Sequence, residues 1–539
     1  PSQSQVAPLP DQLPFRLVSK TIGSGAYASI RKAIPLHASG PVIAVKFINN
    51  AHAFRTGRLK PQQLQLECSL HKLVCPHDNI IRFIDCGASE HWTWMCLELA
   101  EGGDLFDKIE ADEGVPPDIA HLYFTQLCAA VAWCHDRGVA HRDIKPENML
   151  LSAAGALKLA DFGLATFFRD PKTGAHKRPS LVCGSPPYIA PEILAVGRAY
   201  AARKRGSDAA ATAAAAADGY DPAGYDPPAA DTWSCAIVLF VLLAGNTPWD
   251  TPVRHESYEY YEFIATHGHP ADDLWAKVPP DALSLLRGML APEVARRFAM
   301  PAVRAHPWFT RRNPLLDAHG RPADPLALAT QLMQSLRIDL AAAVPDPDPS
   351  SRLAATQPEP ALPLDWEPPQ AAGASLAGHA ASQPALTTPL LVADLLAHDP
   401  SLSQFTPTPS LPLTLTQHAR RFTDIVPAHS LARFLSTQPL PQLVAQLVAA
   451  LHRLSVPVAA PAQGDAYAAS PRVVLRVRTL DTRRQPLHGA VVVEGLAGTA
   501  QGVLEVRFHK EKGDPLGWRR LFKQVAVLCR DGLVVPTEG

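Results

Sequence analysis

The sequence predicts an α+β fold in two folded parts that are joined by a proline-rich segment. Three observations support this prediction. Short runs rich in β-branched and aromatic residues come first, at 15–20, 30–33 and 42–48, and are typical of strands. Apolar residues then recur at helical spacing, as in 119–134 and 232–243, which indicates a larger helical part. Towards the C-terminus the pattern becomes helical and then alternating once more, which indicates a second, smaller unit.

Composition narrows the functional classes before any motif is considered. Hydrophobic residues make up 47% of the 539 residues and charged residues 19%, which allows a buried core and excludes wholesale disorder. Lys and Arg number 50 against 51 Asp and Glu, so we expect no direct nucleic-acid binding through bulk charge. The 9 cysteines form no CxxC pair, which excludes a zinc module or a disulfide framework and indicates a reducing compartment.

Membrane and secretion signals are not expected either. The longest apolar run, 236–244, is far shorter than the ~20 residues that span a bilayer. The first residues lack the charged and then apolar order of a signal peptide. We therefore expect no transmembrane segment and no secretory leader.

Composition and hydrophobic pattern divide the chain into three regions. Most aromatic residues fall in 13–312, which we interpret as one large domain. An Ala-rich and then Gly/Asp/Pro-rich stretch at 195–229 is expected to be a surface insertion in this domain. We expect 313–418 to be a disordered regulatory linker, because residues 341–420 hold 14 Pro, no Lys and only 2 Arg. The remainder, 419–539, is predicted to be a small α+β domain.

Within this last domain the apolar pattern suggests individual elements. Residues 419–453 place apolar side chains on one helical face, and a closing helix is expected at 518–528. Three alternating stretches between them predict strands, at 473–480, 490–496 and 503–509.

A glycine-rich stretch is the first motif in the large domain that carries chemistry. Gly23 and Gly25 lie between two predicted strands, where a backbone without side chains can pass close over a phosphate chain. Lys46 follows on the third predicted strand, and a Lys that emerges from a buried strand needs an anionic partner. The phosphates of ATP and a helix carboxylate, for which Glu67 is the best candidate, would supply it.

Three further motifs, in a fixed order, indicate phosphoryl transfer. They are His141-Arg142-Asp143-Ile144-Lys145-Pro146-Glu147-Asn148, Asp161-Phe162-Gly163 and Ala190-Pro191-Glu192. Phosphoryl transfer needs mainly positioning and neutralisation of charge. Asp143 can accept the hydrogen bond of an attacking hydroxyl, and Lys145 can steady the transferred γ-phosphoryl group. Asn148 and Asp161 can hold Mg²⁺ between phosphates. We therefore expect ATP and Mg²⁺ as cofactors.

The set and order of these motifs resemble eukaryotic protein kinases over 13–312, and we identify them by that match rather than derive them from spacing. Lys145 in HRDIKPEN is similar to the serine/threonine group. The hinge and following helix at 97–109, with DTWSC at 231–235, resemble the calcium/calmodulin-type branch. The resemblance implies a bilobal protein kinase fold, with a small β-rich N-lobe and a larger helical C-lobe.

Within that branch the chain is most similar to the checkpoint kinase 1 family in its fungal form. Residues 487–496 and 504–525 resemble the kinase-associated domain of that family. The resemblance therefore implies a DNA-damage or replication checkpoint effector that phosphorylates protein Ser or Thr and acts in the nucleus and the cytoplasm. We expect it to be a monomer.

The family pattern assigns roles at matching positions. The ATP site would comprise Ile22, Gly23, Gly25, Ala44, Lys46, Glu67, Glu98 and Ala100, with Leu97 as the gatekeeper. Asp104 and Glu147 match positions that bind a basic residue upstream of the phosphoacceptor. Glu192 and Arg297 match a buried structural ion pair. One departure is Ala28 in place of the third glycine of the loop, which should stiffen the loop without blocking ATP.

The sequence after the large domain contains six Ser/Thr-Gln pairs, five of them within 313–418 and one at 437–438. Thr356 and Ser382, each followed by Gln-Pro, resemble the damage-dependent phosphorylation sites of the family. The resemblance implies an upstream checkpoint kinase of the phosphatidylinositol-3-kinase-like class as a partner.

Several alternatives remain open from the sequence. Residues 471–539 hold 12 Lys and Arg against 7 Asp and Glu, and this basic part would dock on the catalytic domain, bind anionic lipid, or simply be a solvated face. The insertion at 195–229 is either an inert loop or a modifier of substrate access. Two alternatives to an active checkpoint-type kinase also stay open. The chain would then be a pseudokinase scaffold, or a polarity or energy-sensing kinase that also carries a kinase-associated domain.

Overall fold

The structure is a computed structural model of the chain. The residues that it describes are 9–10, 12–24, 28–36, 40–55, 60–205, 220–221, 224–336, 421–426, 431–459, 472–481, 485–495 and 503–533. Their contacts divide them into two units: a first unit that holds the described residues up to 336 together with 421–426 and 431, and a second unit that begins at 432.

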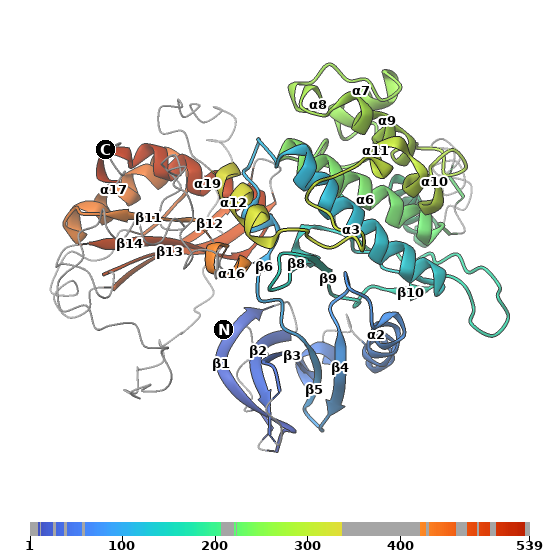
Figure 1. The fold of residues 1–539 in the computed structure, drawn as a ribbon, viewed down its shortest axis with the longest axis horizontal. Coiled ribbons are helices and arrows are strands. Elements are labelled where there is room, and N and C mark those ends of the chain that lie inside the picture. The colour runs from blue at the N-terminus through green and yellow to red at the C-terminus, as the bar shows by residue number, and fades with distance from the viewer. Residues whose placement is uncertain are drawn as a thin grey trace. The chain divides into compact units, whose positions relative to one another are not determined.

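A five-stranded antiparallel sheet opens the first unit (Figure 1). In spatial order its strands are β1 (Phe15–Ser24), β2 (Ala28–Pro35), β3 (Ile43–Asn49), β5 (Trp92–Glu98) and β4 (Phe83–Ala88). Strand β3 lies at the centre, and each of its residues is buried except Lys46, which is half-buried. The sheet therefore projects a single charged side chain from its central strand. Two helices follow β3, namely α1 (Asn50–Arg55) and α2 (Pro61–Val74).

Helices dominate the rest of the first unit. They are α3 (Pro117–Asp136), α4 (Pro191–Lys204), α6 (Pro227–Ala244), α7 (Tyr258–Ala265), α8 (Asp273–Ala276), α9 (Pro280–Met289), α10 (Met300–Ala305) and α11 (Pro307–Thr310). Helix α6 is apolar on all sides and packs against α3 and α9. By length and composition α6 is the one described helix that would suit a membrane span, but 89% of its apolar window is buried in the unit, as expected of a core helix.

Short strands lie where the sheet meets the helical part. Strands β6 (Gly103–Asp104), β8 (Met149–Leu151) and β9 (Leu157–Leu159) form one small sheet, and β7 (Val139–Ala140) pairs with β10 (Thr166–Phe167). The segment after α2 joins β9 through a parallel bridge between Ile80 and Leu159. These pairings fix the loops on either side of β8 and β9, which carry the residues of the candidate site. The β-rich N-lobe and helical C-lobe expected from the sequence are confirmed.

The structure differs from the expected domain boundary at residue 312. The Asn313 side chain donates to the carbonyl of Asp118 near the start of α3, and Gln126 of α3 donates to the carbonyl of Gly320. Helix α12 (Pro325–Ser335) follows, with Asp324 capping its first turn. The described residues 313–336 thus belong to the folded catalytic unit and not to the linker, because long-range hydrogen bonds to α3 hold a segment whose composition resembles that of a loop.

A short segment before the second unit also belongs to the first. Helix α16 (Phe422–Ile425) packs against α12. The ring of Phe422 is 1% exposed and lies against Gly155, in the turn between β8 and β9. Gly155 has a φ of 76°, so a larger residue there would be strained and would also meet the ring.

The second unit is a four-stranded antiparallel sheet covered by two helices. The strand order is β11 (Arg433–Ser436), β14 (Leu504–Lys512), β13 (Pro486–Gly495) and β12 (Arg472–Leu480), and the helices are α17 (Leu440–Arg453) and α19 (Pro515–Leu528). Their apolar residues form one core that includes Leu447, Val491, Phe508 and Phe522. The three expected strands and the closing helix are present.

Two details of this unit differ from expectation. The segment predicted as one helix over 419–453 is interrupted by strand β11, because its residues pair with β14 and tertiary pairing overrides helical periodicity. Arg519 belongs to the basic part 471–539 for which the sequence suggests a docking or solvated face, but it is 3% exposed, and its guanidinium lies 5.1 Å from the ring centroid of Phe522.

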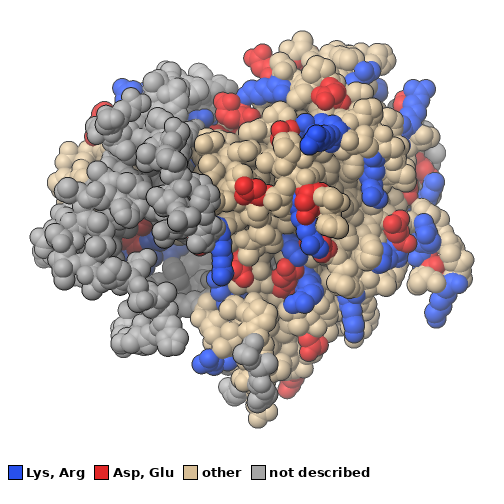
Figure 2. All heavy atoms as spheres, in the orientation of Figure 1, with Lys and Arg blue, Asp and Glu red and all other residues tan. Residues whose placement is uncertain are grey.

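The expected insertion is described only at its two ends. Helix α4 extends into it as far as Lys204, and α6 begins at Pro227, whereas 206–219 lie outside the described residues. Figure 2 shows acidic and basic side chains interspersed over the visible face of the first unit, in agreement with the balanced charge of the sequence.

Candidate active site

Lys46 joins the sheet to two acidic residues that are distant in sequence. Its Nζ lies 2.8 Å from Oε1 of Glu67 on α2 and 2.9 Å from Oδ1 of Asp161. Glu67 is buried, whereas about half of the Asp161 side chain is exposed. The carboxylate of Asp161 is thus held by Lys46 and is still partly exposed to solvent.

These charges shift the pKa values of the two groups in opposite directions. Burial alone would lower the pKa of Lys46, but the carboxylates of Asp161 and Glu67 outweigh that effect and hold it above its ordinary value. The positive charge of Lys46 lowers the pKa of Asp161 to about 2. Both groups are therefore charged at neutral pH, as an ion-binding site requires.

A stack of rings holds α2 in the position that brings Glu67 to Lys46. The His71 ring lies 4.6 Å from that of Phe162 and 5.5 Å from that of Phe83, and Phe162 in turn lies 4.9 Å from His141. Burial lowers the pKa of His71 to about 4, so its imidazole is neutral. Its Nε2 lies 2.7 Å from the carbonyl of Ile81, which can only accept, so Nε2 carries the proton.

The catalytic loop gathers a second group of polar side chains around Asp143. Its Oδ2 lies 2.8 Å from Nζ of Lys145, and its Oδ1 accepts a hydrogen bond from the Ser185 hydroxyl at 3.1 Å. Lys145 also donates to Ser185 at 3.0 Å, and Asn148 donates to the Asp143 carbonyl at 2.8 Å. The carboxylate of Asp143 raises the pKa of Lys145 above its ordinary value despite burial, which would lower it. The four groups form one connected network.

Asp231 of α6 binds the backbone of the catalytic loop. Its carboxylate accepts from the backbone N–H groups of His141 and Arg142, at 2.9 and 2.8 Å, and lies 2.9 Å from Nε2 of His135. Asp231 is completely buried, and these three partners satisfy its charge in a region without water access. The sequence pattern DTWSC identified this residue only as part of a family motif.

The residues expected around the nucleotide lie on the central strands. Ala44 of β3 is opposite Leu97 of β5, and Gly23 lies on β1 and Ile22 is exposed beside it. The Ala100 carbonyl accepts from Gly103, so the adenine contact expected of Ala100 would use its N–H. Gly25 lies outside the described residues, so its expected place over the phosphates stays a prediction.

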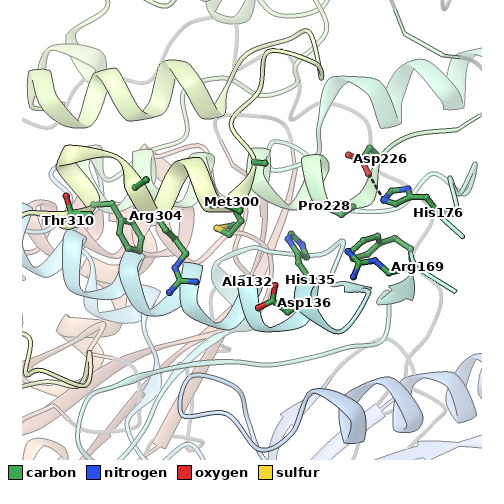
Figure 3. Close-up of a pocket in the computed structure, with 15 residues that line it drawn as sticks. Ala132, His135, Asp136, Arg169, His176, Asp226, Pro228, Met300, Arg304 and Thr310 are labelled. Atoms are coloured by element: carbon green, nitrogen blue, oxygen red, sulfur yellow. Dashed lines mark ion pairs between the residues drawn. The ribbon is translucent and has the colours of Figure 1, made fainter. Parts of the chain in front are cut away.

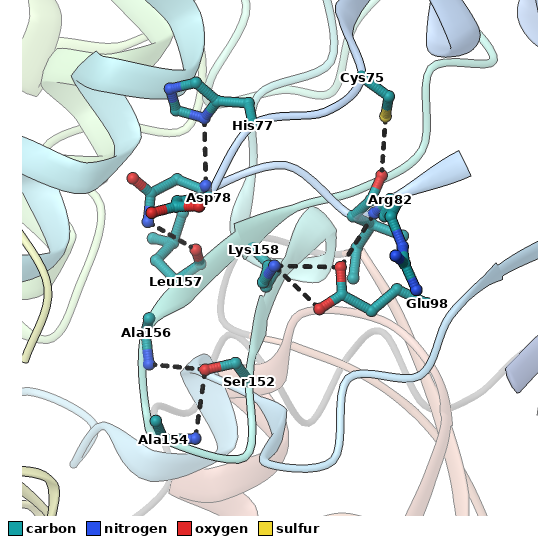
Figure 4. Close-up of polar contacts among 12 residues, drawn as sticks. Cys75, His77, Asp78, Arg82, Glu98, Ser152, Ala154, Ala156, Leu157 and Lys158 are labelled. Carbon is teal, nitrogen blue, oxygen red and sulfur yellow. Dashed lines mark hydrogen bonds and ion pairs between the residues drawn. The ribbon is translucent and has the colours of Figure 1, made fainter. Parts of the chain in front are cut away.

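Glu98 has a side-chain role that the sequence did not indicate. Its carboxylate lies 2.9 Å from Nζ of Lys158 on β9 and accepts the backbone N–H of Arg82 at 3.0 Å (Figure 4). Its own N–H donates to the Arg82 carbonyl at 2.9 Å. The hinge residue is therefore tied both to the segment before β4 and to the small sheet of the C-lobe.

The two acids expected to bind a basic substrate residue lie on neighbouring elements. Asp104 of β6 is opposite Leu150 of β8, three residues after Glu147. Its Oδ1 accepts from the N–H of Phe106 at 2.8 Å, which fixes the carboxylate. Glu147 is exposed in the turn before β8. The Glu147 side chain is thus exposed, and the Asp104 carboxylate binds the Phe106 N–H.

The expected ion pair between Glu192 and Arg297 is present. The guanidinium binds both carboxylate oxygens, at 2.6 and 2.9 Å, and both side chains are buried. It anchors the start of α4, which ends the activation segment that begins at Asp161.

Asn148 and Asp161 meet the requirements of a Mg²⁺ site. Asn148 uses its amide N–H on Asp143, which leaves its amide oxygen as an acceptor, and the Asp161 side chain is about half exposed. Such oxygen donors, completed by phosphate oxygens, suit Mg²⁺. Within the described part of the chain no cluster of three or more His, Cys, Asp or Glu side chains suits a metal ion.

A separate cavity of about 860 Å³ lies on the helical part, between α3 and α10 (Figure 3). Its lining includes His135, Phe168, Asp226, Met300 and Arg304 and none of the expected ATP or catalytic residues. His176 and Asp226, whose side chains approach to 3.9 Å, also line it. This cavity is therefore distinct from the network around Asp143.

Comparison with known proteins agrees with this geometry. The family model described as the protein kinase domain matches residues 17–309. The chain belongs to the protein kinase family. It is 34% identical over 522 residues to the serine/threonine-protein kinase chk1 of Schizosaccharomyces pombe, and the match covers 96% of each chain.

Other fungal relatives match over a similar extent. The chain is 32% identical to CHK1 of Saccharomyces cerevisiae over 99% of this chain and 100% of the relative. It is 29% identical to CHK1 of Mycosarcoma maydis over 100% and 99% of the two chains. This chain is thus a serine/threonine protein kinase of the Chk1 type along nearly its full length, as its motifs predicted.

Proposed function

We propose that this Chk1-type kinase transfers the γ-phosphoryl group of ATP to protein Ser or Thr through Asp143, Lys145, Asn148 and Asp161, as an effector of the DNA-damage checkpoint. The catalytic assignment rests on two ion pairs that are both formed: Lys46 with Glu67, and Lys145 with Asp143. The first pair joins β3 to α2, which would separate in an inactive arrangement, and the second orders the side chains of the catalytic loop.

The chemistry follows from where these groups lie. The substrate hydroxyl oxygen forms a bond to the γ-phosphorus while the bond from that phosphorus to the β–γ bridging oxygen breaks, and ADP leaves. Asp143 accepts the hydroxyl proton, since its carboxylate is fixed by Ser185 and Lys145. Lys145 offsets the charge of the transferred group, and Lys46 that of the α- and β-phosphates.

The nucleotide and the metal would occupy the cleft bounded by β1, β3 and the hinge. We assign Ile22, Gly23, Gly25, Ala44, Lys46, Glu67, Glu98 and Ala100 to the ATP site. Asn148 and Asp161 would hold Mg²⁺, which when bound neutralises phosphate charge during transfer. The hinge contacts are the Glu98 backbone and the Ala100 N–H, and the ties to Lys158 and Arg82 keep this strand end in place.

The substrate class follows from the two acids near the catalytic loop. We assign Asp104 and Glu147 to a subsite for Arg or Lys about three residues before the phosphoacceptor, because carboxylates bind such side chains through charge-assisted hydrogen bonds. Protein substrates with this basic residue would be preferred.

The checkpoint role is inferred from the fungal relatives. We propose that an upstream checkpoint kinase of the phosphatidylinositol-3-kinase-like class phosphorylates Thr356 and Ser382, which lie outside the described residues, and that the chain works in the nucleus as well as the cytoplasm. The kinase-associated domain would restrain the catalytic unit until this phosphorylation occurs.

The catalytic assignment is tested by Asp143→Ala in the full chain. Peptide phosphorylation should fall by about 10²- to 10⁴-fold while ATP binding is retained, because the ion pair of Lys46 is untouched. Ser180→Ala, an exposed change in the activation segment, is the control and should retain turnover. Near-normal turnover by Asp143→Ala would refute the assignment.

A further inference from the structure

Two cysteines lie on the elements that surround Glu67. Cys68 directly follows Glu67 on α2, and Cys86 lies on β4, the edge strand next to β5. Helix α2 packs against β4 (Figure 1). Neither cysteine is in a disulfide; Cys68 is half-buried and Cys86 is exposed. The catalytic assignment gives neither thiol a role.

The register of the sheet places the Cys86 side chain on the face that α2 covers. Cys86 is opposite Met95 of β5, and the next pair along is Gly87 with Trp94. A Cβ on Gly87 would come within 2.5 Å of the Trp94 ring, so these two residues share one face of the sheet. Because successive residues of a strand point to opposite faces, Cys86 and Met95 share the other face.

Met95 is a neighbour of both cysteines. It belongs to one buried cluster with Leu64 of α2, and Cys68 packs against the same cluster. The thiols of Cys68 and Cys86 meet beside it and are joined by a hydrogen bond. The pair therefore connects α2 to β4 at the residue next to Glu67.

The two thiols differ in their access to an oxidant. The thiolate is the form that reacts, and burial raises the pKa of Cys68 to about 12, with a smaller contribution from Cys86 itself. Cys86 is the exposed partner, so an oxidant in solution meets it first. A second hydrogen-bonded pair, Cys128 with Cys235, is completely buried and out of reach. Cys68 and Cys86 thus combine mutual contact with access from solvent.

We propose that Cys68 and Cys86 are a redox modification site that forms a reversible disulfide with hydrogen peroxide as the oxidant. In the first step the Cys86 sulfur takes one oxygen of the peroxide, the O–O bond breaks, and water leaves, which gives a sulfenic acid. The Cys68 sulfur then bonds to the Cys86 sulfur, the S–O bond breaks, and hydroxide leaves with the Cys68 proton as a second water. The two thiols lose two electrons in all, and the peroxide gains them. A thiol reductant reverses the bond by exchange, as expected of a redox-sensing disulfide in a reducing compartment.

The consequence for catalysis follows from the position of Glu67. With the two thiols in contact, the Glu67 carboxylate lies 2.8 Å from Nζ of Lys46. A bond between Cys68 and Cys86 therefore ties α2 to the sheet in the position that this ion pair requires, and the oxidised kinase stays assembled. This consequence rests on the role proposed for Lys46 and Glu67, whereas formation of the bond does not.

The test of the bond is peptide mapping of the reduced full chain after treatment with hydrogen peroxide and then N-ethylmaleimide. Trypsin should release residues 59–72 joined to residues 83–108, and dithiothreitol should separate them. Residues 83–108 also contain Cys96, which packs on the opposite face of the sheet. Cys86→Ser should abolish the joined peptides, and the matched control Cys96→Ala should retain them. Their absence from the oxidised unchanged chain, or their presence in Cys86→Ser, would overturn the proposal.

Stability and turnover test the consequence. The oxidised chain should melt about 5 °C above the reduced chain, because the bond closes a loop in the unfolded state. Peroxide should not raise the melting temperature of Cys86→Ser. We expect kcat of the oxidised chain to stay within about twofold of that of the reduced chain. A loss of kcat on oxidation that Cys86→Ser prevents would overturn the proposed effect on α2. Failure of the catalytic assignment would look different, because Asp143→Ala would then remain active while the joined peptides still formed.

Discussion

The carboxylate of Glu98 and the ammonium of Lys158 lie 2.9 Å apart and join the hinge to strand β9 of the C-lobe. The side chains are 25% and 13% exposed, so the pair is mostly shielded from solvent. The second oxygen of the same carboxylate accepts the N–H of Arg82. A single carboxylate thus fixes the strand end whose backbone is proposed to bind adenine.

The first prediction concerns this tie. Lys158→Ala should raise the KM for ATP roughly fivefold, because loss of a mostly buried, charge-assisted contact of about 1 kcal/mol lets the hinge shift. The kcat should change little, since Lys158 does not contact Asp143 or Lys145. Steady-state kinetics at varied ATP would measure both constants.

Lys177→Ala is the control for Lys158→Ala. It breaks an exposed ion pair with Asp170 on the same unit and should leave the KM for ATP unchanged. An unchanged KM in Lys158→Ala, or an equal rise in both variants, would show that the hinge does not depend on this pair.

The catalytic network was predictable from sequence because each member lies in a local motif. Lys46, Asp143 and Asp161 each follow a recognisable run of residues, and the structure brings Lys46 and Asp161 within 2.9 Å. The partners outside these motifs were not predictable. Lys158 is 60 residues from Glu98, and Ser185 is 42 residues from Asp143, so no local pattern links them.

The errors at the domain boundaries have the same physical origin. Residues 313–336 look like a linker by composition, yet hydrogen bonds from Asn313 and to Gly320 hold them on α3. Phe422 lies in a segment without a strong hydrophobic pattern, and its buried ring packs against Gly155, which is far away in the sequence. The burial of Arg519 could have been inferred from the sequence, because Arg519 lies three positions before Phe522 and so shares its helix face.

The second prediction concerns substrate choice. Glu147→Gln should reduce the preference for Arg three residues before Ser or Thr by roughly tenfold, as the charge-assisted hydrogen bond becomes a neutral one. Asp104→Asn should have a smaller effect, because the Asn oxygen can still accept the Phe106 N–H. Paired peptides with Arg or Ala at that position would measure the ratio of kcat/KM.

Glu101→Gln, an exposed change near Asp104, should leave that ratio intact. If a degenerate peptide library shows no basic preference in the unchanged protein, the subsite assignment fails before any variant is considered.

The third prediction concerns the kinase-associated domain. A chain that ends at residue 431 keeps α16 on the first unit and lacks the second unit, so it should be more active than the full chain if that unit restrains catalysis. The outward residues of β12 include Arg472 and Arg478, which are exposed and would supply the basic docking surface. Tethering makes even weak docking effective.

Specific activity of the two chains on one peptide is the measurement. Arg478→Glu in the full chain should raise activity towards that of the shortened chain, whereas Lys204→Glu on α4 should not. Equal activity of the chain ending at 431 and the full chain would contradict the proposed restraint.

The last prediction concerns the switch. Phosphorylation of Ser382, assisted by Thr356, should relieve the restraint, because each phosphate adds about −1.5 to −2 charges to a segment that holds no Lys over 341–420. The nearest source of opposite charge in the C-terminal part is 471–539, with 12 Lys and Arg against 7 Asp and Glu. A phosphate bound there would compete with docking on the catalytic unit, and a difference of a few kcal/mol between the docked and released states is enough to shift the population.

The measurement is kinase output in cells treated with a replication inhibitor, for the unchanged chain and for one with Ser382→Ala and Thr356→Ala. We expect the double variant to lose most of the rise, whereas Ser403→Ala, at another Ser-Gln pair, should keep it. A full rise in the double variant would place the switch elsewhere in the chain.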